Sequence, residues 1–159
     1  MSNISFRPAL PEDCPLILSF IKALAEYEKM SDQVVATEEL LKEWIFENGK
    51  AEVIFPVVDG EEVGFALFFH NFSTFLGRAG IYLEDLFIKP EYRGKGYGKA
   101  TLQQLGHIAL ERRCGRLEWA CLDWNRPSID FYLSLDAKPM DEWTVYRLAG
   151  DSLRGLEDK

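Results

Sequence analysis

Two adjoining runs decide the fold of this chain: Ile81-Tyr82-Leu83-Glu84-Asp85-Leu86-Phe87-Ile88 and then Arg93-Gly94-Lys95-Gly96-Tyr97-Gly98. The first run predicts a β-strand, and the second is a glycine-rich turn leading into an amphipathic helix that begins near Gly98. The N–H groups of a helix's first turn and the positive end of its dipole bind anions. Glycines let the backbone approach a phosphate, and the basic residues of the run, with Lys99, add charge. The stretch predicts a pyrophosphate cradle over residues 94–99.

The spacing of the glycines excludes two common phosphate motifs. A P-loop needs G-x-x-x-x-G-K-[ST], which the run does not contain. A dinucleotide fingerprint would need glycine at position 99 or 101, where Lys99 and Thr101 stand. Three alternating glycines can also mark only a mobile turn, and composition alone leaves that alternative open.

Length and composition predict one ordinary globular domain over residues 1–159, with 47% hydrophobic and 13% aromatic residues. No apolar stretch approaches the roughly 20 residues that a membrane helix needs. The first residues lack a basic region followed by an apolar core, so no secretory signal is expected. These features predict a cytoplasmic protein.

Charge and cysteines narrow the possible partners. A net charge of −8 argues against nucleic acid and anionic membranes and is compatible with a cationic substrate, although it also serves solubility. Cys14, Cys114 and Cys121 fit no C-x-x-C pattern, and neither His70 nor His107 has a Cys or His at ligand spacing. No metal site is expected.

Periodicity predicts an α/β domain with the order β-α-α-β-β-β-α-β-α-β, that is, a mixed, mostly antiparallel twisted sheet flanked by helices. The predicted strands are Ser5–Pro8, Ala51–Val58, Val63–Phe69, Gly80–Ile88, Leu117–Leu122 and roughly Glu142–Leu148. Helices are predicted over Leu16–Tyr27, from Thr37 to about Asn48, from about Gly98 to Cys114, and from Pro127. Asp59-Gly60 predicts a tight hairpin turn.

Several motifs in the same order resemble the GNAT superfamily of N-acetyltransferases, in its diamine (spermidine/spermine) and thialysine acetyltransferase branch. R-x-x-G-x-G after a strand is similar to that superfamily's acetyl-coenzyme A motif. The other matches are Arg7-Pro8-Ala9 with Asp13-Cys14, Ala25-Glu26-Tyr27-Glu28, Tyr82-Leu83-Glu84-Asp85, and Trp124-Asn125 with Pro127-Ser128-Ile129 and Phe131-Tyr132. Asp136 stands where these enzymes usually have glycine, and Phe75 stands where the thialysine branch has Trp. Both departures concern the acceptor side and leave the acceptor open.

The resemblance implies acetyl-CoA as the cosubstrate, and it implies a role for each matched position. Tyr132 would be the general acid, and Glu84 the base acting through water. The acceptor would lie against Tyr27, Glu28, Glu84 and Asp85. The coenzyme would be held by Leu86, Phe87, Ile88, Arg93, Gly94, Lys95, Gly96, Tyr97, Gly98, Lys99, Asn125, Pro127 and Ser128.

Elementary geometry bears on two of these roles. Asn125, Ser128 and Tyr132 share one helix face at i, i+3 and i+7. In a regular strand, Glu84 would share a face with Tyr82 and Leu86, and Asp85 with Leu83 and Phe87. At least one of the two acids is then expected among apolar groups, where desolvation raises the pKa of a carboxyl group.

The resulting interpretation is an acetyl-CoA-dependent N-acetyltransferase that acts on a primary amine of a small molecule, by direct attack in a ternary complex. Two alternatives stay open: a protein lysine or N-terminal acetyltransferase, and a non-catalytic acyl-CoA sensor. The Trp143 segment and the hydrophobic edges near it predict a homodimer.

Overall fold

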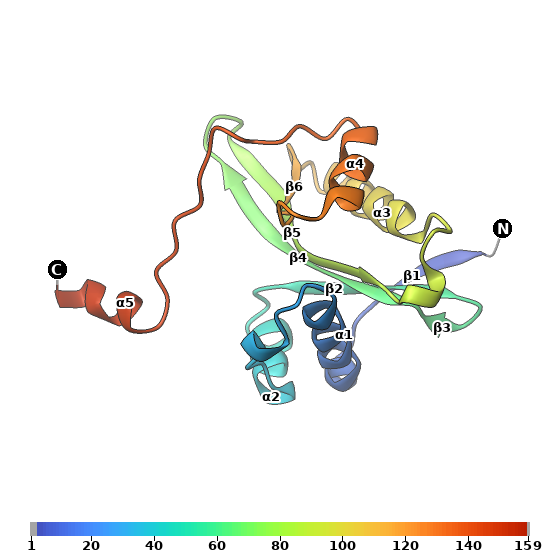
Figure 1. Cartoon of the computed structure of the whole chain (residues 1–159), viewed down its shortest axis with the longest axis horizontal. Coiled ribbons are helices and arrows are strands. Elements are labelled where there is room, and N and C mark those ends of the chain that lie inside the picture. The colour runs from blue at the N-terminus through green and yellow to red at the C-terminus, as the bar shows by residue number, and fades with distance from the viewer. Residues whose placement is uncertain (1–2, 159) are drawn as a thin grey trace. The chain divides into compact units, whose positions relative to one another are not determined.

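A computed structural model describes residues 3–158 of the chain. The chain divides into two compact units, Met1–Ala120 and Cys121–Lys159 (Figure 1). The larger unit carries an open sheet with helices, and the smaller one carries short helices and extended chain.

The first unit follows the predicted order of elements, with one additional two-residue strand and a shorter last strand than predicted. Its strands are β1 (Ile4–Pro8), β2 (Glu52–Val58), β3 (Glu61–Glu62), β4 (Gly64–Ser73), β5 (Arg78–Ile88) and β6 (Leu117–Trp119). Its helices are α1 (Cys14–Tyr27), α2 (Glu38–Leu41) and α3 (Tyr97–Glu111), and a π-helical segment, η3 (Lys42–Glu47), continues α2. Single 3₁₀ turns lie at Pro11–Asp13, Ser31–Gln33 and Pro90–Tyr92. Thr37 caps α2 as predicted, because its hydroxyl accepts a hydrogen bond from the Leu40 N–H over 3.1 Å.

The sheet has the strand order β1-β2-β4-β5-β6, with β3 paired to β2. All pairs are antiparallel except β5 with β6, which are parallel and joined through α3. The Asp59-Gly60 turn is tight as predicted, with both residues at positive φ (52° and 79°). The predicted mixed, mostly antiparallel sheet is confirmed.

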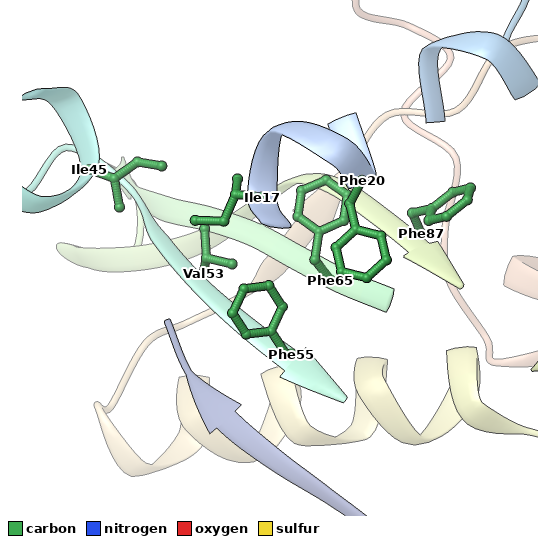
Figure 2. Packing of buried hydrophobic residues seen from close by; sticks show 7 residues of the cluster. All are labelled: Ile17, Phe20, Ile45, Val53, Phe55, Phe65 and Phe87. Carbon is green, nitrogen blue, oxygen red and sulfur yellow. The ribbon is translucent and has the colours of Figure 1, made fainter. Parts of the chain in front are cut away.

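The unit has three layers, with α1 and α2 on one face of the sheet and α3 on the other (Figure 1). Successive side chains of β2 point alternately to these two faces. Val53 and Phe55 point toward α1, where they join an apolar cluster of Ile17, Phe20, Ile45, Phe65 and Phe87 (Figure 2). The rings of Phe20 and Phe65 stack with their centroids 5.7 Å apart. Val58 faces the other way and packs with Tyr97 of α3. The sheet therefore carries buried apolar side chains on both faces at β2.

Three helices end in the same way without a glycine. Lys29 after α1, Arg113 after α3 and Asp136 after helix α4 (Arg126–Ser134) have φ of 62°, 62° and 64°. Each end carries the two backbone hydrogen bonds of a Schellman motif. After α1 they run from Lys29 N to Glu26 O and from Met30 N to Ala25 O. The corresponding pairs are Arg113 N to Leu110 O and Cys114 N to Ala109 O after α3, and Asp136 N to Leu133 O and Ala137 N to Tyr132 O after α4. The left-handed backbone at Asp136 is one that favours glycine.

The second unit contains α4, a short helix α5 (Asp151–Arg154) and a 3₁₀ turn at Gly155–Asp158. The strand predicted over Glu142–Leu148 is wrong: this segment is described and forms neither helix nor strand. Val145 and Tyr146 are 87% and 92% exposed. A strand needs backbone partners on a neighbouring strand, and the described part of this unit supplies none.

Candidate active site

The glycine-rich turn of the first unit is shaped by backbone conformation. Gly94 and Gly96 adopt φ of 76° and 85°, a region that side chains disfavour. Gly96 is the N-cap of α3, and because it has no side chain, no cap side chain accepts a hydrogen bond from the first-turn N–H groups. The turn thus presents bare N–H groups at the positive end of a helix.

Space around this turn is open. A Cβ built on Gly94, Gly96 or Gly98 would meet no heavy atom within 4 Å. By contrast, a Cβ on Gly64 in β4 would lie 2.0 Å from the Phe87 carbonyl oxygen. Gly64 is therefore required by packing, whereas Gly98 is required neither by packing nor by positive φ. The first turn of α3 is thus open at Gly98 to a group that approaches its backbone.

The predicted cradle side chains do not all face outward. Tyr97 is only 6% exposed and packs in the core, so its backbone alone is available to a ligand. Lys95 Nζ lies 5.6 Å from the ring centroid of Tyr92. Lys99 is exposed on the first turn of α3. The backbone, Lys95 and Lys99 together fit a polyanion such as a pyrophosphate.

β5 leads into this turn with an open edge. β6 pairs with β5 only from Ile81 to Leu83, while β4 pairs with it as far as Ile88. Within the described residues of the first unit, no strand pairs with β5 beyond Leu83 on the β6 side. The expected coenzyme-binding residues Leu86, Phe87 and Ile88 lie in this one-sided part of the strand. Its unpaired edge fits an extended ligand with amide groups.

A β-bulge lies at Glu84. Asp85 pairs with Leu67 and Leu83 pairs with Phe68, so Glu84 has no partner on β4. The predicted strict alternation is therefore wrong at this point. Directly opposed residues share a face and consecutive residues alternate, so Leu83 and Asp85 face opposite sides of the sheet. Asp85 does share the α1 face with Phe87, as predicted.

The bulge brings carboxylates together. The Asp85 side chain is half-buried beside the apolar cluster under α1, against which Leu67 packs, and Glu84 is exposed. Burial raises the pKa of Asp85 to about 6, and repulsion from Glu84 and Glu28 adds to that shift. Burial and the Glu84 charge also raise the pKa of Glu28. The expected desolvated acid is confirmed, and it is Asp85.

Arg93 connects the end of β5 with the end of α1. Its Nε donates a hydrogen bond to the Ile88 carbonyl oxygen over 2.8 Å. Its guanidinium carbon lies 4.8 Å from the ring centroid of Tyr27 and 5.3 Å from that of Phe87. The structure thus brings Tyr27 and Arg93, predicted for different ligands, into contact.

In the second unit, α4 begins with Asn125 as its N-cap. The Asn125 amide oxygen accepts a hydrogen bond from the Ser128 N–H over 3.3 Å, and Pro127 lies in the first turn. The side chain of Asn125 is buried and engaged in this cap, so it has a structural role. Tyr132 lies two turns further along, half-buried, with its ring centroid 5.6 Å from that of Phe131.

Sequence reasoning missed two features of the site. The bulge at Glu84 leaves no sign in a pattern that reads as a regular strand. The contact between Arg93 and Tyr27 joins positions distant in sequence, and the two residue types alone do not predict it.

In the part of the chain that the structure describes, no group of three His, Cys, Asp or Glu side chains is placed to hold a metal ion. No helix among residues 3–158 is both long and apolar enough to cross a membrane.

Comparisons with known proteins find relatives of this chain. Residues 18–136 match the model of the acetyltransferase (GNAT) family. The chain is 37% identical over 171 aligned positions to a thialysine N-epsilon-acetyltransferase of Sus scrofa, with all of both chains covered. It is 28% identical to an L-ornithine N5-acetyltransferase of Arabidopsis thaliana, over 95% of this chain and 86% of the relative.

Solved structures share the fold. An integron cassette protein from the mobile metagenome of V. cholerae superposes with a TM-score of 0.81 at 28% identity, covering 100% of this chain and 99% of the other. A predicted acetyltransferase with acetyl-CoA from Clostridium acetobutylicum superposes with a TM-score of 0.74 at 19% identity, covering 92% and 97%.

Proposed function

Because the chain belongs to the acetyltransferase (GNAT) family, we propose that it acetylates a primary amine of a small molecule by direct attack on acetyl-CoA in a ternary complex. Membership of the family makes it an acetyl-transferring enzyme that uses acetyl-CoA. What we propose beyond this is the class of acceptor, the roles of individual residues and the state of assembly.

The observation that carries this proposal is the group of carboxylates at the Glu84 bulge. The charges that shift the pKa values of Asp85 and Glu28 all come from other carboxylates. Such a group gains from an incoming cation, because an opposite charge relieves the mutual repulsion. A protonated amine is that cation. The relatives named for thialysine and ornithine acetylation support an acceptor with an amine at the end of a short chain.

Chemistry assigns a task to each proposed group. An alkylamine has a pKa near 10.4 and attacks only as the free base, so its proton must be removed near neutral pH. Glu84, at the exposed bulge, accepts that proton through water, while Tyr27, Glu28 and Asp85 hold the acceptor. The amine nitrogen then bonds to the thioester carbon and the carbon–sulfur bond breaks. Tyr132 gives its phenolic proton to the leaving thiolate, and the second proton of the attacking nitrogen leaves as the amide forms and restores the phenol through water.

The coenzyme is proposed to bind along β5 and the turn that follows it. Residues 94–99 hold the pyrophosphate, Leu86, Phe87 and Ile88 line the pantetheine arm, and Asn125, Pro127 and Ser128 contribute the start of α4. Acetyl-CoA supplies the activated acetyl group. A backbone N–H of the open β5 edge stabilises the negative charge that develops on the carbonyl oxygen.

A panel of amines tests the proposal. Purified protein is mixed with acetyl-CoA and with single amines, including ornithine, lysine analogues, diamines and a lysine-containing peptide, and thiol release is followed. Turnover of small amines well above that of the peptide supports the proposal. Turnover of the peptide alone indicates a protein acetyltransferase, and binding of acetyl-CoA without turnover indicates a sensor.

The assembly is proposed as a homodimer formed by single-domain chains over residues 1–159. Support comes from the second unit, where Trp143, Val145 and Tyr146 lie in a segment of high β propensity that is exposed and unpaired. A cytoplasmic location stays a prediction from the sequence.

A further inference from the structure

Arg93 is held in place by three contacts, two at the end of β5 and one at the end of α1. Its Nε is committed to the Ile88 carbonyl oxygen at the end of β5. Its guanidinium lies over the rings of Tyr27 and Phe87. A guanidinium over aromatic rings is attracted by the negative electrostatic potential of the ring faces. These contacts direct the charge toward the last residue of α1.

The other cation of the glycine-rich turn is placed differently. Lys95 lies over Tyr92, whose hydroxyl donates a hydrogen bond to Glu61 of β3. Lys95 therefore lies by Tyr92, whereas Arg93 lies by Tyr27 at the end of α1. The two cations of this short motif thus have different neighbours, although the sequence predicts the same phosphate-binding role for both.

The residue that Arg93 contacts lies directly before Glu28. Tyr27 is the last residue of α1, and Glu28 is its C-cap. The chain then turns at Lys29 with φ 62°, closed by the Met30 N to Ala25 O and Lys29 N to Glu26 O hydrogen bonds. Because this turn is short and fully hydrogen-bonded, the position of Tyr27 determines where Glu28 stands relative to Glu84 and Asp85.

We propose that Arg93 is a positioning residue for the acceptor: it clamps Tyr27 against the end of β5 and thereby holds Glu28 at the carboxylates of the Glu84 bulge. The inference rests on the proposed function, because it takes that group of carboxylates as the amine site. It assigns to Arg93 a task different from the phosphate contact that its place in the glycine-rich motif predicts.

Kinetics separate the two tasks. Arg93→Met keeps an unbranched side chain but removes the charge and the donor. It should raise KM for the amine about tenfold, the equivalent of roughly 1.4 kcal/mol, while the Kd for acetyl-CoA changes less than about threefold. Lys95→Met is the matched variant and should weaken acetyl-CoA without raising KM for the amine. Tyr27→Leu removes the ring beneath the guanidinium and should raise KM for the amine as Arg93→Met does.

The opposite split would overturn the inference. If Arg93→Met weakens acetyl-CoA strongly and leaves KM for the amine unchanged, the guanidinium serves the phosphates. Failure of the wild type to acetylate any amine would instead reject the proposed function, and the clamp then needs a measurement independent of turnover.

Amide hydrogen exchange tests the contact between Arg93 and Tyr27 without any turnover. Without the clamp, the end of α1 should open more often, so the Lys29 and Met30 amides of Arg93→Met should exchange about tenfold faster. The Cys114 amide, which closes the same motif at the end of α3, is the internal control and should not change. Equal exchange at Met30 in wild type and Arg93→Met overturns the clamp, whatever the turnover.

Discussion

Leu83 and Asp85 face opposite sides of β5 although they are only two residues apart. Leu83 pairs with Phe68 and Asp85 with Leu67, and the bulge at Glu84 takes up the extra residue. Without the bulge, one of them would sit on the wrong face: either Leu83 would leave the α3 side or Asp85 would leave the α1 side. The bulge thus keeps the core packed while it turns a carboxylate toward the end of α1.

Asp85→Asn should stabilise the protein at pH 7. The folded-state pKa of Asp85 is raised from 3.8 to about 6, so the folded state binds the proton more tightly than the unfolded state. Stability therefore falls as the pH rises from about 4 to 6, and removing the charge should recover on the order of 2 kcal/mol above pH 6. Urea unfolding of wild type and Asp85→Asn at pH 4, 5, 6 and 7 should show a difference that grows with pH. A constant difference would contradict the shift.

Tyr132→Phe should lower kcat by a factor on the order of 10²–10⁴, the usual effect of losing a positioned proton donor. Only the hydroxyl is removed, so the fold and acetyl-CoA affinity should stay close to wild type. Steady-state kinetics with calorimetry of acetyl-CoA binding measures both quantities.

Glu84→Gln should instead weaken the low-pH limb of the rate profile, because that limb reports protonation of the base. Rates of wild type and Glu84→Gln measured between pH 5.5 and 9 test this. Full kcat in both Tyr132→Phe and Glu84→Gln, with unaltered pH profiles, would remove these two residues from the mechanism.

Gly98→Glu should weaken acetyl-CoA binding more than about tenfold, because it adds a negative charge to the first turn of α3, where a pyrophosphate is proposed to bind. Gly106→Glu is the matched control in the same helix, since both sites are open and neither has positive φ. Glu is a better helix former than Gly, so both variants should fold at least as stably as wild type. Gly96 is less suitable, since its φ of 85° would strain any side chain. Equal acetyl-CoA affinity of Gly98→Glu and Gly106→Glu in calorimetry would contradict the cradle.

Asp136→Gly should stabilise the fold by about 1 kcal/mol, because Asp136 holds a left-handed conformation after α4 with φ 64°. Asp136→Ala is the control: it also removes the carboxylate but keeps the Cβ, and it should be no more stable than wild type. Thermal unfolding of the three proteins should rank glycine first. If alanine stabilises as much as glycine, the gain comes from lost charge.

A dimer of about twice the 18.2 kDa chain mass should appear in light scattering at micromolar concentration. Tyr146→Glu should dissociate it, because this side chain is 92% exposed within the chain and its segment is proposed to pair in the dimer. Val35→Glu, at an 83% exposed site of the first unit, should leave the dimer intact. A single 18 kDa species for the wild type would contradict the assembly.

The sequence by itself determined the elements whose signals are local. The Asp59-Gly60 turn, the Thr37 cap and the glycine-rich entry to α3 depend on φ preferences and capping groups of neighbouring residues, and each is confirmed. Periodicity likewise placed the helix that forms α1 and the strand that forms β2, because each must bury apolar side chains to fold. The predicted strand at Glu142–Leu148 was wrong, because β propensity forms a strand only where another strand provides hydrogen bonds.

Only the tertiary structure decided how the site is built. The bulge at Glu84 depends on the register between β4 and β5, which the pattern of one strand does not contain. The raised pKa of Asp85 depends on burial against α1 and on Glu28, a residue far away in sequence. The contact between Arg93 and Tyr27 depends on where the end of α1 meets the end of β5. Electrostatics and cation–π attraction act through space, so residues of familiar type acquired their surroundings only when the sheet and helices packed together.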